Sequence, residues 1–469
     1  MATPSPGRTG RWRRGALLSA AALVIFLTSV LSYSRIVSFP LLAFDPTHDT
    51  EILMRRLAVS AESDWQPLRL VSNIWIEGTL RLWRPLNSLL FEGYYRGFGD
   101  RARAWHALSL LVHSLNAVAL FFLLRLLFRN TWAAGISAWL FSLRIPVALV
   151  SFLLDNKSSL HREKLLGWVA GLGHLNMSLC YLVALALALY YAERGKRWAW
   201  PAALLSFALA FGFKEDAVTL PLVLTGMILI RGGVRRLWPF LASFWLLDLV
   251  FALAWRGLMG GEAVPQNLTF RPAARVIWWW GLLLAGPLPA SPRELSTNTQ
   301  QWAVLWVGLS ISWFLLLRKR ALRSRLAFLL ATLASLCIVL GGGLLIFGED
   351  YGMLRIWQPW TAALHDLVFL WVMVFLLVRR PRELALGVWW VAGVFVPSAL
   401  ITAGRQSPQD YYLPEIWPAM LAGLFVVEVV ALLREKLERS RAASASPRAE
   451  APAPPGGGRP PGTSLECGR

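Results

Sequence analysis

Long apolar runs recur along the whole chain and alternate with short polar or basic stretches. Most runs approach the roughly 20 residues that an α-helix needs to cross a bilayer, and they are continuous rather than alternating, which disfavours a closed β-barrel. The pattern predicts an all-α, polytopic membrane protein with about twelve transmembrane helices. The expected spans are 16–33, 104–128, 132–154, 165–192, 198–213, 217–231, 237–258, 302–317, 325–347, 356–378, 384–402 and 412–433.

Basic residues follow every second expected span, which places those loops and both termini in the cytoplasm. The basic stretches are 125–129, 194–197, 231–236, 318–323, 379–382 and 434–441. The apolar segment VIWWWGLLLAGPLP, 276–289, is short and ends in proline. Counting it as a span would move every later basic stretch outside, so we expect an interfacial or re-entrant helix on the outer face.

The chain is expected to divide into three regions. Residues 1–15 form a cytoplasmic N-terminus, and 16–433 form the membrane domain. Its first external loop, 34–103, mixes apolar and charged residues and predicts one or two amphipathic helices on the membrane surface. Residues 434–469 are expected to be a disordered cytoplasmic tail, because their end is rich in proline, glycine and alanine.

Composition agrees with a membrane protein, since 56% of the 469 residues are hydrophobic and only 16% are charged. The formal charge of +20 comes from arginines beside apolar runs. This placement favours contact with membrane lipids over nucleic acid, which is not an expected partner. Two of the three cysteines lie in apolar runs and one lies in the tail, so no disulfide framework is expected. The alanine- and arginine-rich usage favours a bacterial inner membrane.

Four stretches carry a family resemblance when they are taken in order. They are RPLNSLLFEGYYRGFGDRARAWHALSLLVHSLNAVALFFLLRLLF (84–128), HREKLLGWVAGLGHLN (161–176), FGFKEDAVTLPLVL (211–224) and QDYYLPEIWPAMLAGLFVV (409–427). The series resembles the C-superfamily integral-membrane glycosyltransferases, in the branch of the protein O-mannosyltransferases and the membrane mannosyltransferases that carry tetratricopeptide repeats, here without the repeats. The order and spacing agree over roughly residues 16–430, with departures at Leu172, His174 and Gln409.

The resemblance implies transfer of a sugar, expected to be a mannose-like hexose, from a polyprenyl-phosphate carrier to an acceptor protein or glycan on the periplasmic or luminal side. Such a reaction needs a carboxylate to take the proton of the acceptor hydroxyl. By resemblance this acid follows the first span, where Asp49 is the first candidate, Asp45 the second and Glu51 the third. The alternative is that all three are solvated acids of a surface helix.

The departing phosphate needs nearby cations. Lys214, in the short external turn 214–216, is the first candidate, although a lysine that snorkels to the interface would look the same in sequence. Arg84 is the second candidate, against an ordinary interfacial arginine. Glu215 is expected to orient Lys214 or to contact the sugar, and Asp216 is expected to cap the next helix.

Four further polar residues within the motifs are candidates for substrate contact. His113 and Asn116 are three residues apart and share a helix face, which fits either a cavity lining or, as we favour, hydrogen bonds between helices. His161 and His174 complete the set. Neither histidine has metal-ligand spacing to other strong ligands, so we expect no metal site and no cofactor besides the lipid-linked donor, with a divalent metal left as an alternative.

Two other functions compete with glycosyl transfer. A transporter or flippase for a lipid carrier would show polar residues at mid-membrane and two related halves. Neither feature stands out, because the charges gather near the ends of spans. A non-catalytic membrane scaffold is the other alternative, and the departures at Leu172, His174 and Gln409 leave it open.

Overall fold

The computed structural model describes residues 8–42, 49–63, 75–77, 80–143, 165–232, 234–259, 372–373, 375–401, 412–413 and 416–445. The chain divides into two units, 1–425 and 426–469, and the described part of the second unit is the later part of helix α18 (Ile416–Ala445). Helices make up nearly all of the described chain, which confirms the predicted helical class.

Four helical stretches are long and apolar enough to cross a membrane, namely Gly15–Ser38, Ala102–Phe128, Val169–Arg194 and Arg235–Leu258. They comprise most of α1 (Arg8–Tyr33) with η1 (Ser34–Ser38), α5 (Ala102–Phe128), η2 (Val169–Gly171) with α9 (Leu172–Arg194), and most of α12 (Val234–Met259). Each coincides with an expected span. The expected spans 302–317 and 325–347, most of 356–378 and the segment 276–289 lie outside the described residues.

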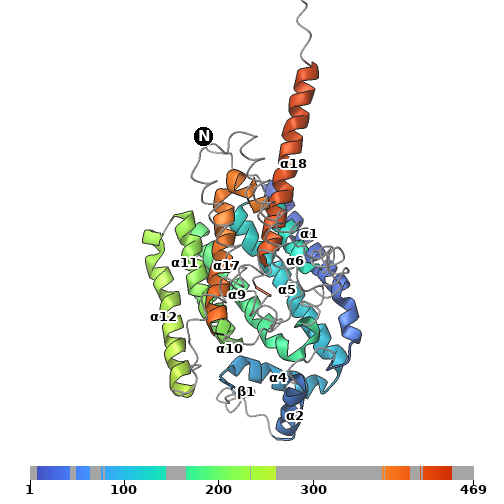
Figure 1. Cartoon of the computed structure of the whole chain (residues 1–469), viewed down its shortest axis with the longest axis vertical. Helices are drawn as coiled ribbons and strands as arrows, with labels where there is room; N and C mark the ends of the chain where they lie inside the picture. The colour runs from blue at the N-terminus through green and yellow to red at the C-terminus, as the bar shows by residue number, and fades with distance from the viewer. Residues whose placement is uncertain are drawn as a thin grey trace, which may run out of the picture. The chain divides into compact units, whose positions relative to one another are not determined.

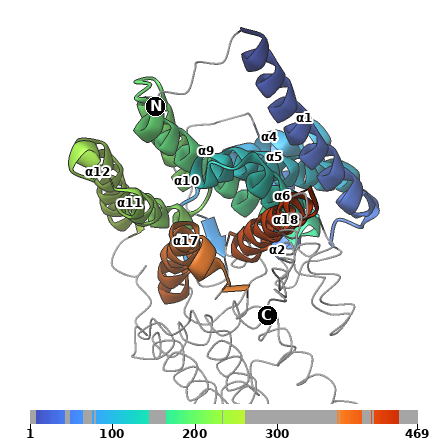
Figure 2. The same ribbon diagram turned by 90° about the horizontal axis from the view of Figure 1, so that it is seen from above.

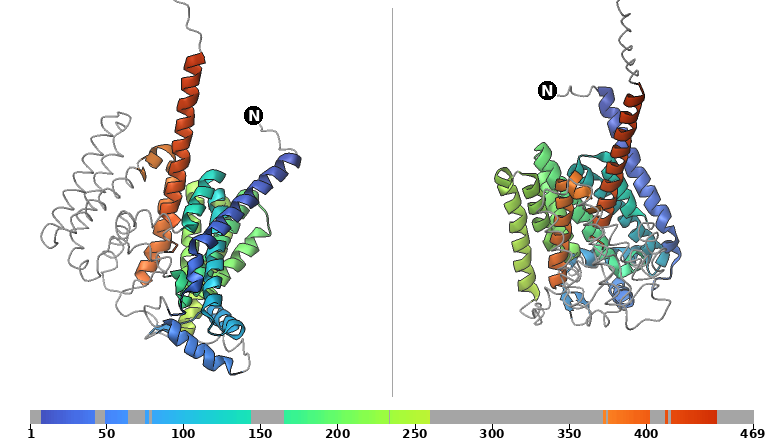
Figure 3. Two further views of the ribbon diagram at one scale, coloured as in Figure 1. Left: turned by 90° about the vertical axis from the view of Figure 1, so that its right-hand side faces the viewer. Right: turned by 45° about the horizontal axis from the view of Figure 1, so that its top comes forward.

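The first unit is organised around α5 and α9, which pack against each other. Helix α9 also packs on α10 (Ala199–Phe213), and α5 packs on α1 and on α6 (Thr131–Ser142). Helix α11 (Leu220–Arg231) contacts α12 and α17 (Pro381–Ile401). Figure 2 shows α12 and α1 on opposite flanks of this group, and Figures 1 and 3 show α2 (Asp49–Ala61) and α4 (Pro85–Phe98) across one end of it.

The expected third span, 132–154, is wrong as a single continuous helix. Helix α6 ends at Ser142, and Leu143 is extended (φ −94°, ψ 151°). Twelve residues rise only about 18 Å, which is less than the roughly 30 Å hydrocarbon core. The sequence offers a physical reason, because Pro146 has no N–H with which a continuing helix would bond the carbonyl of Ser142. Residues 144–164 lie outside the described part.

The expected disordered tail is wrong over its first part, because α18 continues to Ala445. The added segment, REKLERSRAASA, consists mostly of good helix formers. Glu435 and Arg439 form an ion pair one turn apart, which supports an exposed helix. Residues 446–469 lie outside the described part.

The segment 34–103, expected to be the first external loop, contains helices, as expected, and also a hairpin that was not predicted. The amphipathic character of α2 is confirmed, because Leu53, Met54 and Leu57 are buried while Ile52 is exposed. Strands β1 (Trp75–Glu77) and β2 (Leu80–Leu82) pair antiparallel, with Glu77 opposite Leu80. Glycine at position 78, between two short strand-forming stretches, was the available signal.

Arg96 ties α2 to α4. Its Nη2 donates to the main-chain oxygens of Ser60 (3.1 Å) and Ser63 (2.8 Å), at the end of α2. Its Nε donates to Glu92 (2.8 Å), whose side chain is buried. Arginine thus adds a side-chain donor to the carbonyl groups at the C-terminal end of α2. The contact holds α2, which carries the candidate acids Asp49 and Glu51, against α4.

The basic ends of three helices meet at one end of the unit. Arg231, which ends α11, donates to Glu193 near the end of α9 (3.0 Å) and to the carbonyl of Leu127 near the end of α5 (3.0 Å). Arg129 also lies 3.5 Å from Glu193. The stretches 125–129, 194–197 and 231–236 thus share one side, which the positive-inside argument requires.

Close contacts at two glycines bring α4 against α9 and α10. A Cβ at Gly173 would lie 2.5 Å from Oδ1 of Asn87, and one at Gly212 would lie 2.4 Å from Cγ of Leu86. Only a residue without a side chain allows these helices to approach so closely. Leu86 and Asn87 lie in the first turn of α4, which begins at Pro85, so the contacts fix where the N-cap residue Arg84 lies.

Substituting Gly212→Ala should therefore push α4 away. We expect a loss of about 1–3 kcal/mol in unfolding free energy, as for overpacked cores. The measurement is the thermal unfolding midpoint of the purified protein in detergent. Gly97→Ala is the matched control, because its Cβ would meet nothing within 4 Å in the described structure, and it should be neutral or slightly stabilising. Equal midpoints for the two variants would contradict the contact.

Candidate functional site

The candidate site lies where the start of α4, the start of α9 and the α10–α11 turn come together. Helix α10 ends at Phe213, and Lys214 is extended (φ −161°, ψ 143°) before the 3₁₀ turn η3 (Glu215–Thr219) leads into α11. This confirms the short turn expected at 214–216. Five ionisable residues meet here and are called the charge cluster. They are Arg84, His174, Lys214, Glu215 and Asp216.

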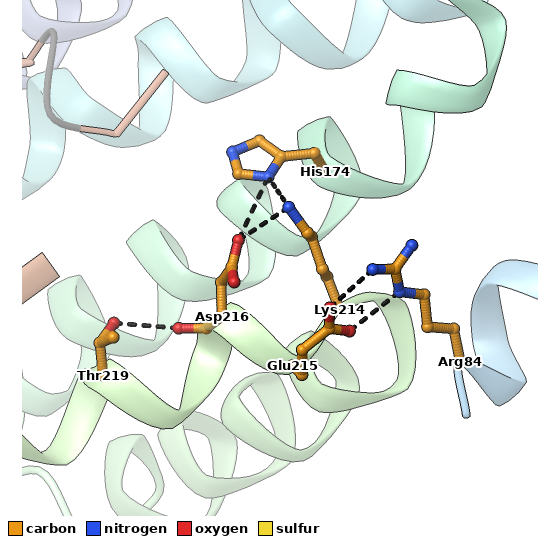
Figure 4. A network of polar contacts seen from close by, with 6 residues as sticks. All are labelled: Arg84, His174, Lys214, Glu215, Asp216 and Thr219. Carbon is orange, nitrogen blue, oxygen red and sulfur yellow. Dashed lines mark hydrogen bonds and ion pairs between the residues drawn. The ribbon is translucent and has the colours of Figure 1, made fainter. Parts of the chain in front are cut away.

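Lys214 points into the protein between His174 and Asp216 (Figure 4). Its Nζ lies 2.8 Å from Oδ2 of Asp216 and 3.3 Å from Nδ1 of His174. The side chains of Lys214 and Asp216 are only 4% and 8% exposed. Lys214 therefore forms a buried ion pair with Asp216 and does not extend toward the membrane interface.

The position of Lys214 determines the tautomer of His174. An ammonium group donates hydrogen bonds and cannot accept them, so Nδ1 of His174 must accept. The ring proton of the neutral imidazole then lies on Nε2. Nδ1 also lies 3.8 Å from Oδ2 of Asp216, so the three side chains form one compact group.

Arg84 and Glu215 form the second ion pair of the charge cluster. Nε and Nη2 of Arg84 donate to the two carboxylate oxygens of Glu215, at 2.9 and 2.6 Å. This two-bond geometry is the strong form of an arginine–carboxylate contact. Burial alone would raise the pKa of Glu215, but the charge and hydrogen bonds of Arg84 outweigh it and lower that pKa below its ordinary value.

This lowered pKa predicts how stability depends on pH. Ionised Glu215 stabilises the folded state above its unfolded-state pKa, and the contribution is lost as pH falls through the lower folded-state pKa. The difference in unfolding midpoint between the wild type and Glu215→Gln should be constant from pH 7 to about 5. It should shrink only below the ordinary value of 4.5. A difference that is already lost above this value would contradict the ion pair.

The polar residues of α5 bond to neighbouring parts of the chain, as favoured from sequence. Nδ2 of Asn116 donates to the carbonyl of Leu175 in α9 (3.0 Å), and Nδ1 of His113 lies 2.7 Å from the hydroxyl of Tyr412. The ring of Tyr412 also meets that of His174 edge-on, with centroids 6.0 Å apart. Tyr412 thus links α5 to the charge cluster, a role that sequence spacing did not reveal.

The candidate acids are placed less fully. Asp45 lies outside the described residues, and so does His161. Asp49 begins α2. Glu51 forms an ion pair with Arg55 (2.5 Å), and its side chain is 37% exposed. Helix α2, which carries Asp49 and Glu51, packs on α4 and on η2. Arg84 directly precedes α4, and η2 directly precedes α9, the helix that carries His174.

One expectation about the turn 214–216 is wrong, and a second one remains a prediction. Asp216 does not cap a helix, since neither η3 nor α11 has a side-chain cap; its carboxylate binds Lys214 instead. Glu215 binds Arg84, which lies 131 residues away in the sequence and was not an expected partner. In both cases the strongest available opposite charge determines the partner. The expectation that Glu215 orients Lys214 or contacts the sugar stays a prediction.

The fold and the charge cluster define a helical membrane protein with a buried, ion-paired site at one end of its helices. Searches of protein-family models, of curated proteins and of solved structures find no match to this chain. Among the described residues no group of three or more His, Cys, Asp or Glu side chains is placed to hold a metal ion, and the expectation about metal stays a prediction.

Proposed function

We propose that the protein is a multi-pass membrane glycosyltransferase. It transfers a mannose-like hexose from a polyprenyl-phosphate carrier to an acceptor protein or glycan on the periplasmic or luminal face. The proposal includes about twelve spans, both termini in the cytoplasm and a bacterial inner membrane. The sequence resemblance supplies the reaction class, and the geometry of the charge cluster supports the location of the site.

One observation carries the proposal. Ionisable residues within a membrane domain are costly and usually serve function. Here two cations and two carboxylates are held at the end of the helices opposite the basic stretches, since His174 and Glu193 are about 28 Å apart along α9. If the basic end is cytoplasmic, the charge cluster faces the outer leaflet, where a lipid-linked donor presents its head group.

We assign roles to the candidates on this basis. Arg84 and Lys214 stabilise the phosphate as it leaves the sugar, with Glu215 and Asp216 holding them in place. Asp49, or else Asp45 or Glu51, takes the proton of the acceptor hydroxyl as it attacks the anomeric carbon. The products are the glycosylated acceptor and the bare polyprenyl phosphate. His113 and Asn116 hold α5 against the site.

The test is a transfer assay with the full-length protein in liposomes and radiolabelled polyprenyl-phosphate mannose. Wild type should release label from the carrier, and Asp49→Asn, Asp45→Asn and Lys214→Ala should be compared with it. Arg439→Ala, in an exposed ion pair of α18, is the control. Equal release in wild type and the three site variants would contradict these assignments. Movement of the intact carrier across the bilayer without sugar release would identify a flippase instead.

A further inference from the structure

Two polar atoms of the charge cluster are buried without a partner in the described structure. They are Nε2 of His174 and Oδ1 of Asp216. Both side chains are more than nine-tenths buried. Buried polar groups are nearly always hydrogen-bonded, so each exception calls for an explanation. Here the two exceptions belong to side chains whose other polar atoms meet at Lys214.

The two atoms have complementary hydrogen-bonding character. Because Lys214 occupies Nδ1 as a donor, Nε2 of His174 carries the proton and is a donor without an acceptor. Oδ1 of Asp216 is an acceptor without a donor. Nδ1 of His174 and Oδ2 of Asp216 lie 3.8 Å apart, so the two side chains that carry the unpartnered atoms are direct neighbours.

We propose that His174 and Asp216 form a subsite for the sugar of the lipid-linked donor, in which Nε2 donates to one sugar hydroxyl and Oδ1 accepts from another. This inference rests on the proposed function and names the part of the donor that these residues bind. Lys214 is then a positioning residue for both groups as well as a neighbour of the phosphate.

The chemistry of the pair disfavours other ligands. A free phosphate would meet the negative Oδ1, and a metal cation would meet the N–H of His174. A sugar carries several hydroxyl groups, and each can donate or accept, so it offers a suitable partner to each of the two atoms. The phosphate is matched by Arg84 instead, whose side chain is 13% exposed beside Glu215. The charge cluster therefore offers separate contacts for the sugar and for the phosphate.

The test compares two probes, polyprenyl-phosphate mannose and bare polyprenyl phosphate, on the full-length protein in nanodiscs, with binding followed by tryptophan fluorescence. Wild type should bind the mannose-bearing carrier about tenfold to hundredfold more tightly, because hydrogen bonds to buried groups are added. Analogues of the mannose-bearing carrier that each lack one hydroxyl group provide a test without a protein variant. The analogue that lacks the hydroxyl group bound by His174 or Asp216 should lose the tighter binding.

Two substitutions of one residue complete the test. His174→Leu should remove most of the preference for the mannose-bearing carrier and leave the affinity for bare carrier unchanged, since Lys214 and Asp216 stay paired. His174→Gln should restore much of the preference, because its amide accepts from Lys214 and donates to the sugar.

Three outcomes would overturn the subsite. Equal wild-type affinity for both probes, parallel weakening of both by His174→Leu, or no effect of that variant would each show that His174 does not contact sugar. If the protein transfers sugar but His174→Leu keeps the wild-type preference for the mannose-bearing carrier, the subsite is wrong and the proposed glycosyltransferase function is supported. Binding of neither probe would overturn the proposed function and the subsite with it.

Discussion

Replacing Lys214 with methionine should destabilise the protein by about 3–5 kcal/mol, one of the two largest effects we expect. The substitution leaves the carboxylate of Asp216, 8% exposed, without its counter-ion at 2.8 Å. A buried charge that loses its partner retains the cost of desolvation and loses the compensating attraction. The unfolding midpoint in detergent, with residual helix content by circular dichroism, measures the effect.

A double substitution separates stability from function. Lys214→Met together with Asp216→Leu replaces the pair by apolar side chains of similar size, and such replacements are often neutral or stabilising. We expect the double variant to regain most of the lost stability and to remain inactive in sugar transfer. A double variant as unstable as Lys214→Met would show that the pair does not account for the loss. Full transfer activity would show that neither residue acts in the reaction.

Removing the proposed general base should slow the proposed sugar transfer by about a hundredfold to ten-thousandfold. We expect this loss for Asp49→Asn, with a folded protein and an unchanged unfolding midpoint, because asparagine has the same shape but a far weaker affinity for protons. Single-turnover transfer from polyprenyl-phosphate mannose measures it.

The other candidate acids serve as comparisons in the same assay. Asp45→Asn should show the large loss only if Asp45, not Asp49, is the base. Glu51→Gln should have the smallest effect, because Glu51 is partly exposed and paired with Arg55. The largest loss in Glu51→Gln would contradict this ranking. Losses of less than tenfold in all three variants would remove general-base catalysis from the first external loop.

The local pattern predicted the helices well where it depends on apolar length alone. The expected spans 104–128 and 198–213 agree closely with α5 and α10. It did less well where short-range signals compete. Helix α6 stops before Pro146, α18 continues through polar helix formers, and the β1–β2 hairpin was hidden in a mixed segment. Average hydrophobicity does not report these features, because caps, prolines and turns act over a few residues.

The candidate site was predicted in its members but not in its pairing. Lys214, Glu215, Arg84 and His174 were all candidates from the motifs, and the structure brings them together. The partner of each was missed, since Glu215 binds Arg84 and Asp216 binds Lys214. Tyr412 lies in a motif, yet its contacts with His113 and His174 depend on segments far apart in sequence.

By itself, the sequence determined that this chain is a helical membrane protein and that its charges gather near helix ends. Both properties follow from the free energy of transferring side chains from water to lipid. Each residue contributes to this free energy nearly independently of the others. Only the tertiary structure decided which charges are paired and which atoms of His174 and Asp216 are left over. Pairing depends on the close approach of α4, α9 and α10 at Gly173 and Gly212, and no local pattern encodes a distance between helices.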